Sequence, residues 1–370
     1  MLINGSFLTH ATTEADRFAL ELLAALGRRG ELAGARVVVP RRAELHAAVP
    51  PGLPVDEAGA RLGVLWEQLD LPRLAGAGWL INLGGTAPML RQRQLVLLPD
   101  AAAVVTHPEE YGAAARLGRR LMTAAVMQRA DCVATLSRFG ADELTRHFGQ
   151  RPRGIEVLPP GGDHILRERA DRSVFQRLDL RGRRYWLVAD SARPSRPLGA
   201  DSARPSRPLG AALQALEQLA DPHVLLVAAE REGKAPAAPG AGTPAHSYTH
   251  PRLRRTGAVS PAQWRALFEG AACFVDPSTC AASGMAVLEA MNCGCPTLAA
   301  QRGALPEVCA DASLYFDPAD PATLAAQLQR LLGSSHLAHE LRAAGHERAR
   351  LLSWDATAQA FSALGQRLAV

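Results

Sequence analysis

Long apolar runs are missing from this chain of 370 residues. No stretch approaches the roughly 20 consecutive apolar residues that a helix needs to cross a bilayer. The first five residues, Met-Leu-Ile-Asn-Gly, also lack the charged-then-apolar order of a signal peptide. Aromatic residues make up only 5% of the chain, and 48% is hydrophobic, which is typical of a globular protein. We therefore expect a globular protein that stays in the cytoplasm.

Paired metal ligands are also missing. None of the six cysteines belongs to a C-x-x-C pair, and no histidine lies at the spacing of a zinc site. We expect buried thiols in a reducing compartment and no metal site. The cysteines are Cys132, Cys273, Cys280, Cys293, Cys295 and Cys309.

Lysine is almost absent, since Lys234 is the only one, and the net charge of +5 therefore comes from arginine. The arginines are spread along the chain without interleaved aromatic residues, so we expect no nucleic-acid partner. One predicted helix leaves two interpretations open, either contact with an anionic membrane surface or, as we favour, an ordinary solvated face. Its face would combine Arg116, Arg119 and Arg120 with Leu117, Leu121 and Val126.

Short apolar segments alternate with helical periodicity along the whole chain. This alternation is typical of parallel sheets covered by helices on both faces. Strands are expected at 2–3, 35–40, 78–83, 95–98, 132–136, 185–188, 224–227 and 273–275, and helices at 15–26, 261–268, 286–292 and 321–332.

The length and the restart of this pattern predict two domains. We expect an N-terminal Rossmann-like domain over 1–165 and a second over 170–350, with a breaker-rich hinge at 159–163. A last helix at 351–370 is expected to return to the first domain. Residues 200–210 repeat residues 189–199 without a change, and this duplication lengthens the loop after the first strand of the second domain.

The stretch 273–318 carries the most chemical information. Asp276 is expected to end a strand, Ser283 to cap the following helix and Gly294 to terminate it. Small residues before a helix N-terminus form a site suited to phosphate. Glu289 lies on this helix, and we favour a functional role for it over an exposed helix glutamate.

This stretch resembles the donor-binding signature of glycosyltransferase family 4, whose members are retaining enzymes with the GT-B fold. The shared residues are Pro277, Ser278, Gly284, 287–291, Gly294, Pro296 and 305–308. Other segments resemble a bacterial branch used in surface-polysaccharide assembly, namely 65–68, 71–72, 82–83, 86–88, 137–139, 161–166, 257–260 and 353–354. The resemblance implies two Rossmann-like domains facing a cleft.

The resemblance also implies roles for particular residues. A nucleoside-diphosphate leaving group would be neutralised by arginine and by a helix N-terminus, without a metal or other cofactor. Glu289 would be the carboxylate on the ribose side, and no catalytic residue is assigned. The implied donor-binding residues are Arg196, Arg207, Ser283, Gly284, Met285 and Glu289, and the implied acceptor-side residues are Asp100 and His107.

Four positions depart from the family pattern. Ala281 replaces a glutamate that contacts the donor sugar, and Glu14 replaces a glycine. Pro99 stands where the family has histidine, and Asp190 lies where a basic or small residue would face the diphosphate.

Two functions follow from these observations. We favour a glycosyltransferase that moves a hexose, with mannose as the first candidate, from a nucleotide sugar to a glycan or lipid-linked acceptor with retention. Such an enzyme would work in the cytoplasm, in contact with the inner membrane if the arginine-bearing helix binds lipid. The alternative is a catalytically degenerate relative that acts as a binding or scaffold subunit.

Overall fold

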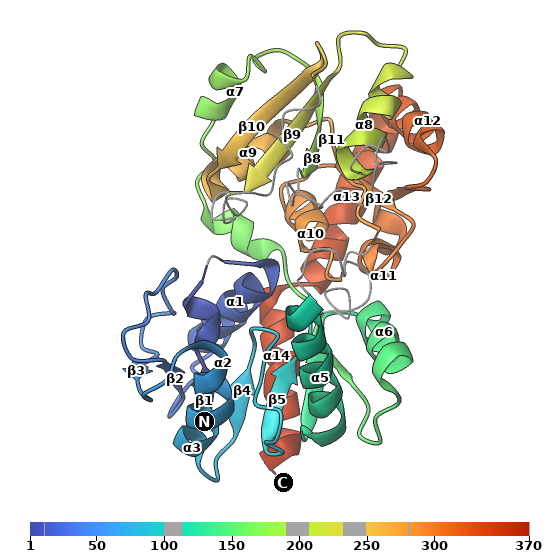
Figure 1. Cartoon of the computed structure of the whole chain (residues 1–370). Coiled ribbons are helices and arrows are strands. Elements are labelled where there is room, and N and C mark those ends of the chain that lie inside the picture. The colour runs from blue at the N-terminus through green and yellow to red at the C-terminus, as the bar shows by residue number, and fades with distance from the viewer. Residues whose placement is uncertain (11, 100–112, 190–206, 232–248, 280–281, 370) are drawn as a thin grey trace. The chain divides into compact units, whose positions relative to one another are not determined.

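The computed structural model describes residues 1–10, 12–99, 113–189, 207–231, 249–279 and 282–369, which form two compact units (Figure 1). The first unit contains Met1–Pro160 together with Trp354–Val370, and the second contains Gly161–Ser353. Each unit is built on a parallel sheet, which confirms the predicted α/β class.

The first unit contains a seven-stranded sheet in the order β3-β2-β1-β4-β5-β6-β7, in which all neighbours are parallel. The order reverses between β1 and β4, the position where open α/β sheets bind ligands. The strands are β1 (Leu2–Asn4), β2 (Arg36–Val39), β3 (Val55–Glu57), β4 (Leu80–Asn82), β5 (Gln94–Leu97), β6 (Cys132–Thr135) and β7 (Glu156–Val157). The helices are η1 (Ser6–Leu8), α1 (Glu14–Arg28), α2 (Gly63–Leu65), η2 (Trp66–Asp70), α3 (Leu71–Ala75), α5 (Ala113–Arg129), α6 (Arg138–Phe148) and α14 (Trp354–Ala369).

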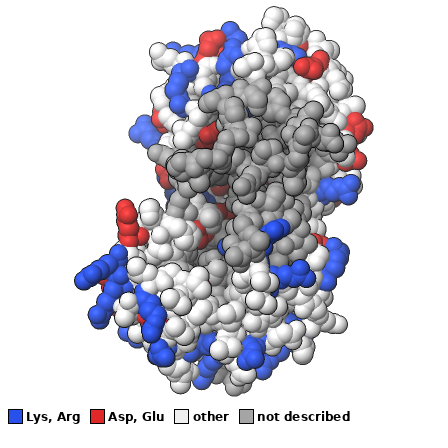
Figure 2. Space-filling view, viewed as in Figure 1, with Lys and Arg blue, Asp and Glu red and all other residues white. Residues whose placement is uncertain are grey.

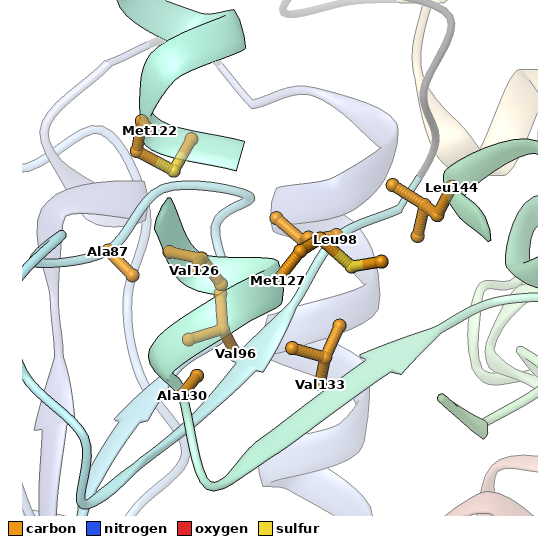
Figure 3. Close-up of a cluster of buried hydrophobic side chains, with 9 residues drawn as sticks. All are labelled: Ala87, Val96, Leu98, Met122, Val126, Met127, Ala130, Val133 and Leu144. Carbon is orange, nitrogen blue, oxygen red and sulfur yellow. The ribbon is translucent and has the colours of Figure 1, made fainter. Parts of the chain in front are cut away.

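Apolar side chains of α5 pack on β5 and β6 and form one part of this unit's core (Figure 3). Met122, Val126 and Met127 recur at helical spacing and face Val96 and Val133 of the strands. Val126 is therefore fully buried and does not share the exposed face of α5 with Leu117 and Leu121, so this part of the membrane-face prediction is wrong.

The helices α1 and α14 pack together, although they lie at opposite ends of the chain. Thr13 and Asp16 form a capping box that starts α1, in which each side chain accepts a hydrogen bond from the other residue's backbone N–H. The rings of Phe18 and Trp354 meet edge to face, with 5.5 Å between their centroids. The C-terminal helix thus completes the core of the first unit.

The second unit contains a six-stranded parallel sheet in the order β10-β9-β8-β11-β12-β13. The order reverses between β8 and β11, so the carboxyl ends of these two strands are the expected ligand position. The strands are β8 (Tyr185–Ala189), β9 (Leu225–Arg231), β10 (Leu253–Val259), β11 (Cys273–Asp276), β12 (Thr297–Ala300) and β13 (Leu314–Phe316). The helices are η4 (Asp163–Arg167), α7 (Ser173–Arg177), α8 (Arg207–Glu217), α9 (Pro261–Gly270), α10 (Met285–Asn292), α11 (Leu305–Cys309), η5 (Ala310–Ala312), α12 (Pro321–Leu332) and α13 (Ser335–Leu351).

The described arginines are dispersed over the surface drawn in Figure 2, and most of the described cysteines are buried. On the face drawn in Figure 2, the described arginines form separate groups and no continuous basic band. Four described cysteines are buried and Cys293 is half-buried, and burial raises the pKa of the Cys132 thiol to about 12. Within the described ranges, every helix is too short or too polar to cross a bilayer.

Candidate functional site

The candidate site lies in the second unit, where β11 ends and α10 begins. Asp276 is the last residue of β11 and is buried, and its Oδ1 accepts a hydrogen bond of 3.0 Å from the Ser278 backbone N–H. Burial raises the pKa of the Asp276 carboxyl above its usual range, although the hydrogen bond from Ser278 opposes the shift. The strand end and the following turn are therefore fixed by a local polar contact.

The N-terminus of α10 is capped by Gly284 and not by Ser283, so the predicted cap is wrong by one residue. Gly284 has φ +63°, and an added Cβ would lie 3.0 to 3.2 Å from three atoms of Val308. Only glycine meets both requirements without strain. The hydroxyl oxygen of Ser283 still contributes, because it accepts a hydrogen bond of 3.2 Å from the Met285 backbone N–H. Ser283, Gly284 and Met285 are all buried.

The helix ends at Asn292, and Gly294 follows its C-cap Cys293 as the expected terminating residue, with φ +69° and an N–H that donates to the Met291 carbonyl at 3.0 Å. The carboxyl edge of β11 and the eight-residue helix α10 thus have the geometry that the motif predicted, with the single exception of the cap.

Glu289 is completely buried, which excludes the alternative of an exposed helix glutamate. His164 Nε2 lies 2.8 Å from its Oε1, and Trp264 Nε1 donates to its Oε2 at 3.3 Å. The His164 side chain is only 4% exposed, so both side chains of this contact are withdrawn from water. A buried carboxylate requires such partners, because its desolvation is costly.

The close approach of η4 to α10 depends on Gly162. A Cβ at this position would lie 2.5 Å from the Leu288 carbonyl carbon and 2.6 Å from the Glu289 backbone nitrogen. The absence of a side chain lets the segment before His164 touch the backbone of α10. The run 161–166 therefore has a packing role that its sequence did not reveal.

The structure brings four of the predicted donor-binding residues together on one short segment: Ser283, Gly284, Met285 and Glu289. Arg207 begins α8, and Arg196 lies outside the described residues. Asp100 and His107, the predicted acceptor-side residues, also lie outside the described residues, as do Asp190 and Ala281 and most of the duplicated loop. Glu14 is the exposed first residue of α1, and Pro99 follows β5.

Sequence reasoning missed His164 and Trp264. The only available signal for His164 was its place in the run 161–166, which resembles the bacterial surface-polysaccharide branch and gave no partner for the imidazole. Trp264 lies in the helix predicted at 261–268, for which no functional role was predicted. In the described part of the chain, no three His, Cys, Asp or Glu residues gather as metal ligands would.

A second polar cluster lies in the first unit, where β1 and β4 end side by side. Asn4 Nδ2 donates to Glu67 Oε1 at 2.9 Å and to Asn82 Oδ1 at 3.0 Å, and Thr86 Oγ1 donates to Glu67 Oε1 at 2.6 Å. Glu67 lies on the π-helix η2 and is 7% exposed. Burial raises the pKa of the Glu67 carboxyl, while the hydrogen bonds from Thr86 and Asn4 limit the rise.

The second unit also matches a known family by sequence. Residues 208–334 match the family described as glycosyl transferases group 1, and this range contains β11, α10 and Glu289. The D-inositol 3-phosphate glycosyltransferase of Segniliparus rotundus is 28% identical over 223 residues, which are 59% of this chain and 48% of the relative. The O-antigen chain mannosyltransferase B of Escherichia coli is 33% identical over 103 residues, 28% of this chain and 27% of the relative. The chain thus spans half or less of the length of these curated relatives.

Solved structures share the fold over nearly the whole chain. Sucrose-phosphate synthase from Thermosynechococcus elongatus aligns with a TM-score of 0.73 at 17% identity and covers 99% of this chain and 98% of its own. Anabaena HepE in complex with UDP-glucose aligns with a TM-score of 0.69 at 16% identity, over 99% of both chains. WaaG, a glycosyltransferase involved in lipopolysaccharide biosynthesis, aligns with a TM-score of 0.65 at 16% identity over 97% of both chains.

Proposed function

We propose that this chain, which belongs to the group 1 glycosyltransferase family and has the GT-B fold, transfers a sugar from a nucleotide-sugar donor. The observation that carries this proposal is the position of the matching motif. It lies where β11 ends beside β8, at the reversal of strand order in the second unit, and it starts α10 through a buried glycine turn. Open α/β sheets bind nucleotides at such positions.

The donor would bind at the start of α10, where Ser283, Gly284 and Met285 order the first turn. Backbone N–H groups at a helix N-terminus favour an anion, and arginines that follow β8 in the sequence would complete the neutralisation of the diphosphate. We assign this role to Arg207 and Arg196. We propose that the Glu289 carboxylate accepts hydrogen bonds from the ribose hydroxyls. The related fold of HepE was solved with UDP-glucose, which supports a nucleotide sugar as the ligand class.

The sugar and acceptor are proposed from the relatives and from the sequence motifs. A hexose, with mannose as the first candidate, would be transferred with retention to a glycan or a lipid-linked acceptor, and the Escherichia coli relative is named as a mannosyltransferase. Asp100 and His107 remain the acceptor-side candidates. The protein would act in the cytoplasm without a metal or other cofactor.

Contact of α5 with the inner membrane is the alternative to the ordinary solvated face that we favour for this helix. On α5, the side chains of Leu117 and Leu121 are 59% and 56% exposed, and Arg116 and Arg120 lie on the same helix. Exposed leucines beside arginines suit the surface of an anionic bilayer.

A scaffold function is the second candidate. It is favoured by the four departures from the family pattern, at Glu14, Pro99, Asp190 and Ala281. Alanine provides no polar contact to a donor sugar, and an aspartate beside the diphosphate would repel it. A degenerate transferase would retain the fold and bind an active partner enzyme.

Calorimetric titration with UDP, GDP and their common sugar conjugates tests the proposal. Binding of one nucleotide by the natural chain, weakened at least about tenfold by Glu289→Gln, is expected, since about 1.4 kcal/mol corresponds to a tenfold change. Glu340→Gln, at an exposed carboxylate on α13, is the matched control and should bind like the natural chain. No binding of any nucleotide would reject donor binding and favour the scaffold function.

A further inference from the structure

A buried histidine–glutamate contact lies in the second unit, and its glutamate is on the helix that the proposed donor motif begins. His164 Nε2 and Glu289 Oε1 are 2.8 Å apart, and their side chains are 4% and 0% exposed. The imidazole comes from η4, which is a different segment of the chain from the donor motif.

Three elements hold this pair from three directions. The helices α9, α10 and η4 contact one another pairwise, and each contributes one side chain: Trp264, Glu289 and His164 respectively. Trp264 is itself fixed in the core, because its ring meets Phe268 edge to face at 5.1 Å. The Glu289 carboxylate therefore cannot rotate freely about its side-chain bonds.

The backbone prevents the imidazole from moving away. Gly162 packs on the Leu288–Glu289 peptide with no room for a Cβ. This contact fixes the start of η4, the segment that bears His164, against α10. The Arg265 guanidinium, on α9, donates to the carbonyls of Leu166 and Glu168 and so ties the other end of η4 to the same helix as Trp264. Both ends of the segment that bears His164 are thus fastened.

We propose that His164 is a positioning residue for the donor. It holds the Glu289 carboxylate in the orientation in which that carboxylate accepts hydrogen bonds from the ribose hydroxyls. This inference rests on the proposed function. Glu289 has no exposed surface in this structure, so a ribose hydroxyl reaches it only when a covering group moves aside. The restraint from His164 then determines where the carboxylate is presented, and an oriented acceptor binds a hydroxyl more tightly than a free one.

The test compares ribonucleotides with analogues that lack the ribose hydroxyls. UDP and 2′,3′-dideoxy-UDP, or the guanine pair if the natural chain binds GDP, are titrated against the natural chain, His164→Ala, His164→Gln and Glu289→Gln. The natural chain should prefer the ribonucleotide by about tenfold or more. His164→Ala and Glu289→Gln should reduce this preference below about threefold while the affinity for the dideoxy analogue changes little. The glutamine amide can still donate to the carboxylate, so His164→Gln should keep most of the preference.

Several outcomes would overturn the inference. Equal losses for both ligands in His164→Ala would mean that the histidine only stabilises the fold, and an unchanged preference would mean that it does nothing for the ribose. If His164→Ala does not fold, His164→Gln and Trp264→Phe are compared instead. Trp264→Phe removes only the N–H that donates to Glu289 Oε2. His336→Ala, on the exposed surface of α13, is the matched control and should behave like the natural chain.

The result also separates this inference from the proposed function. A natural chain that binds no nucleotide rejects both. A natural chain that binds ribo- and dideoxynucleotides equally keeps donor binding but rejects the assignment of Glu289 to the ribose, and with it the role of His164.

Discussion

Arg151 is a buried arginine whose guanidinium donates hydrogen bonds to backbone carbonyls. It is 6% exposed and donates to the carbonyls of Met127 at 2.9 Å, Ala130 at 2.7 Å and Gly154 at 3.0 Å. These groups include the carbonyls left without a helical partner at the end of α5. One residue thus closes the C-terminus of the helix that covers β5 and β6.

Replacement of Arg151 by methionine should strongly destabilise the first unit. Several buried carbonyls would lose their donors at once, and we expect a loss of about 3 kcal/mol in the free energy of unfolding. Urea unfolding followed by circular dichroism measures it. Arg153→Met is the matched control, because Arg153 is exposed and its pair with Asp131 should contribute less than about 1 kcal/mol. A similar loss in both variants would contradict the role of burial.

Glu67 should make the stability of the first unit depend on pH. Its folded-state pKa is raised by burial, so its contribution to stability is fully present below the unfolded pKa and is lost as the pH rises through the folded pKa. The natural chain should therefore gain stability relative to Glu67→Gln as the pH falls from neutral toward the ordinary carboxyl range. Urea unfolding at pH 7.5 and 5 measures the difference. A pH-independent difference, like that expected of the exposed control Glu347→Gln, would refute it.

At the scale of the elements, the strands and helices with clear apolar periodicity were predicted correctly, and elements without it were missed. The strands predicted at 95–98 and 273–275 and the helix at 321–332 agree with β5, β11 and α12 within a residue or two. The strand β10 was not predicted, because the Arg-Arg-Thr run in its sequence Leu-Arg-Arg-Thr-Gly-Ala-Val is polar and five of its seven residues are not buried. The π-helix η2 was not predicted either, since its register depends on tertiary contacts such as that of Trp66 Nε1 with the Ala58 carbonyl.

Because η4 packs closely on α10, we expect one added methyl group at Gly162 to lower the free energy of unfolding. In Gly162→Ala the new Cβ would overlap the Leu288–Glu289 peptide, and we expect a loss of about 2 kcal/mol as the two helices separate. Thermal unfolding by calorimetry measures the change. The same substitution at Gly118, in α5 with nothing within 4 Å of the added Cβ, should instead stabilise by about 0.5 to 1 kcal/mol. Equal effects at both positions would show that close packing is not the cause.

At the scale of the whole molecule, the last helix connects the end of the chain to the first unit. Trp354 is fully buried against Phe18, and Thr357 Oγ1 donates to the Pro159 carbonyl at 2.6 Å. Pro159 lies next to the boundary between the units, so both places where the chain passes from one unit to the other are close to this hydrogen bond.

Trp354→Ala should therefore weaken the first unit selectively. Removal of a buried tryptophan side chain costs about 3 to 5 kcal/mol, and the cavity would lie between α14 and α1. Hydrogen exchange read by peptide should accelerate in α1 and α14 and remain unchanged in β11 and α10. Leu351→Ala, at a 68% exposed position on α13, is the control and should change neither unit. Acceleration of equal size in both units would show that they unfold as one body.

The amino-acid order was sufficient for the α/β architecture, and it predicted the turn between β11 and α10 on which the proposed site depends. The alternation of short apolar strands with helices requires two parallel sheets, and the motif at 273–318 places a glycine turn and a carboxylate after a strand end. These properties are local, because side-chain periodicity and turn chemistry are read over a few neighbouring residues.

The surroundings of Glu289 were decided by tertiary packing alone. Nothing in the segments that contain His164, Trp264 and Glu289 indicates that they meet, because their contact depends on how η4, α9 and α10 pack. The same holds for Val126, whose helical neighbours suggested a surface face but which the sheet buries. Burial and pairing are properties of the assembled core, and a periodic pattern identifies the apolar side of a helix without saying which distant segment will cover it.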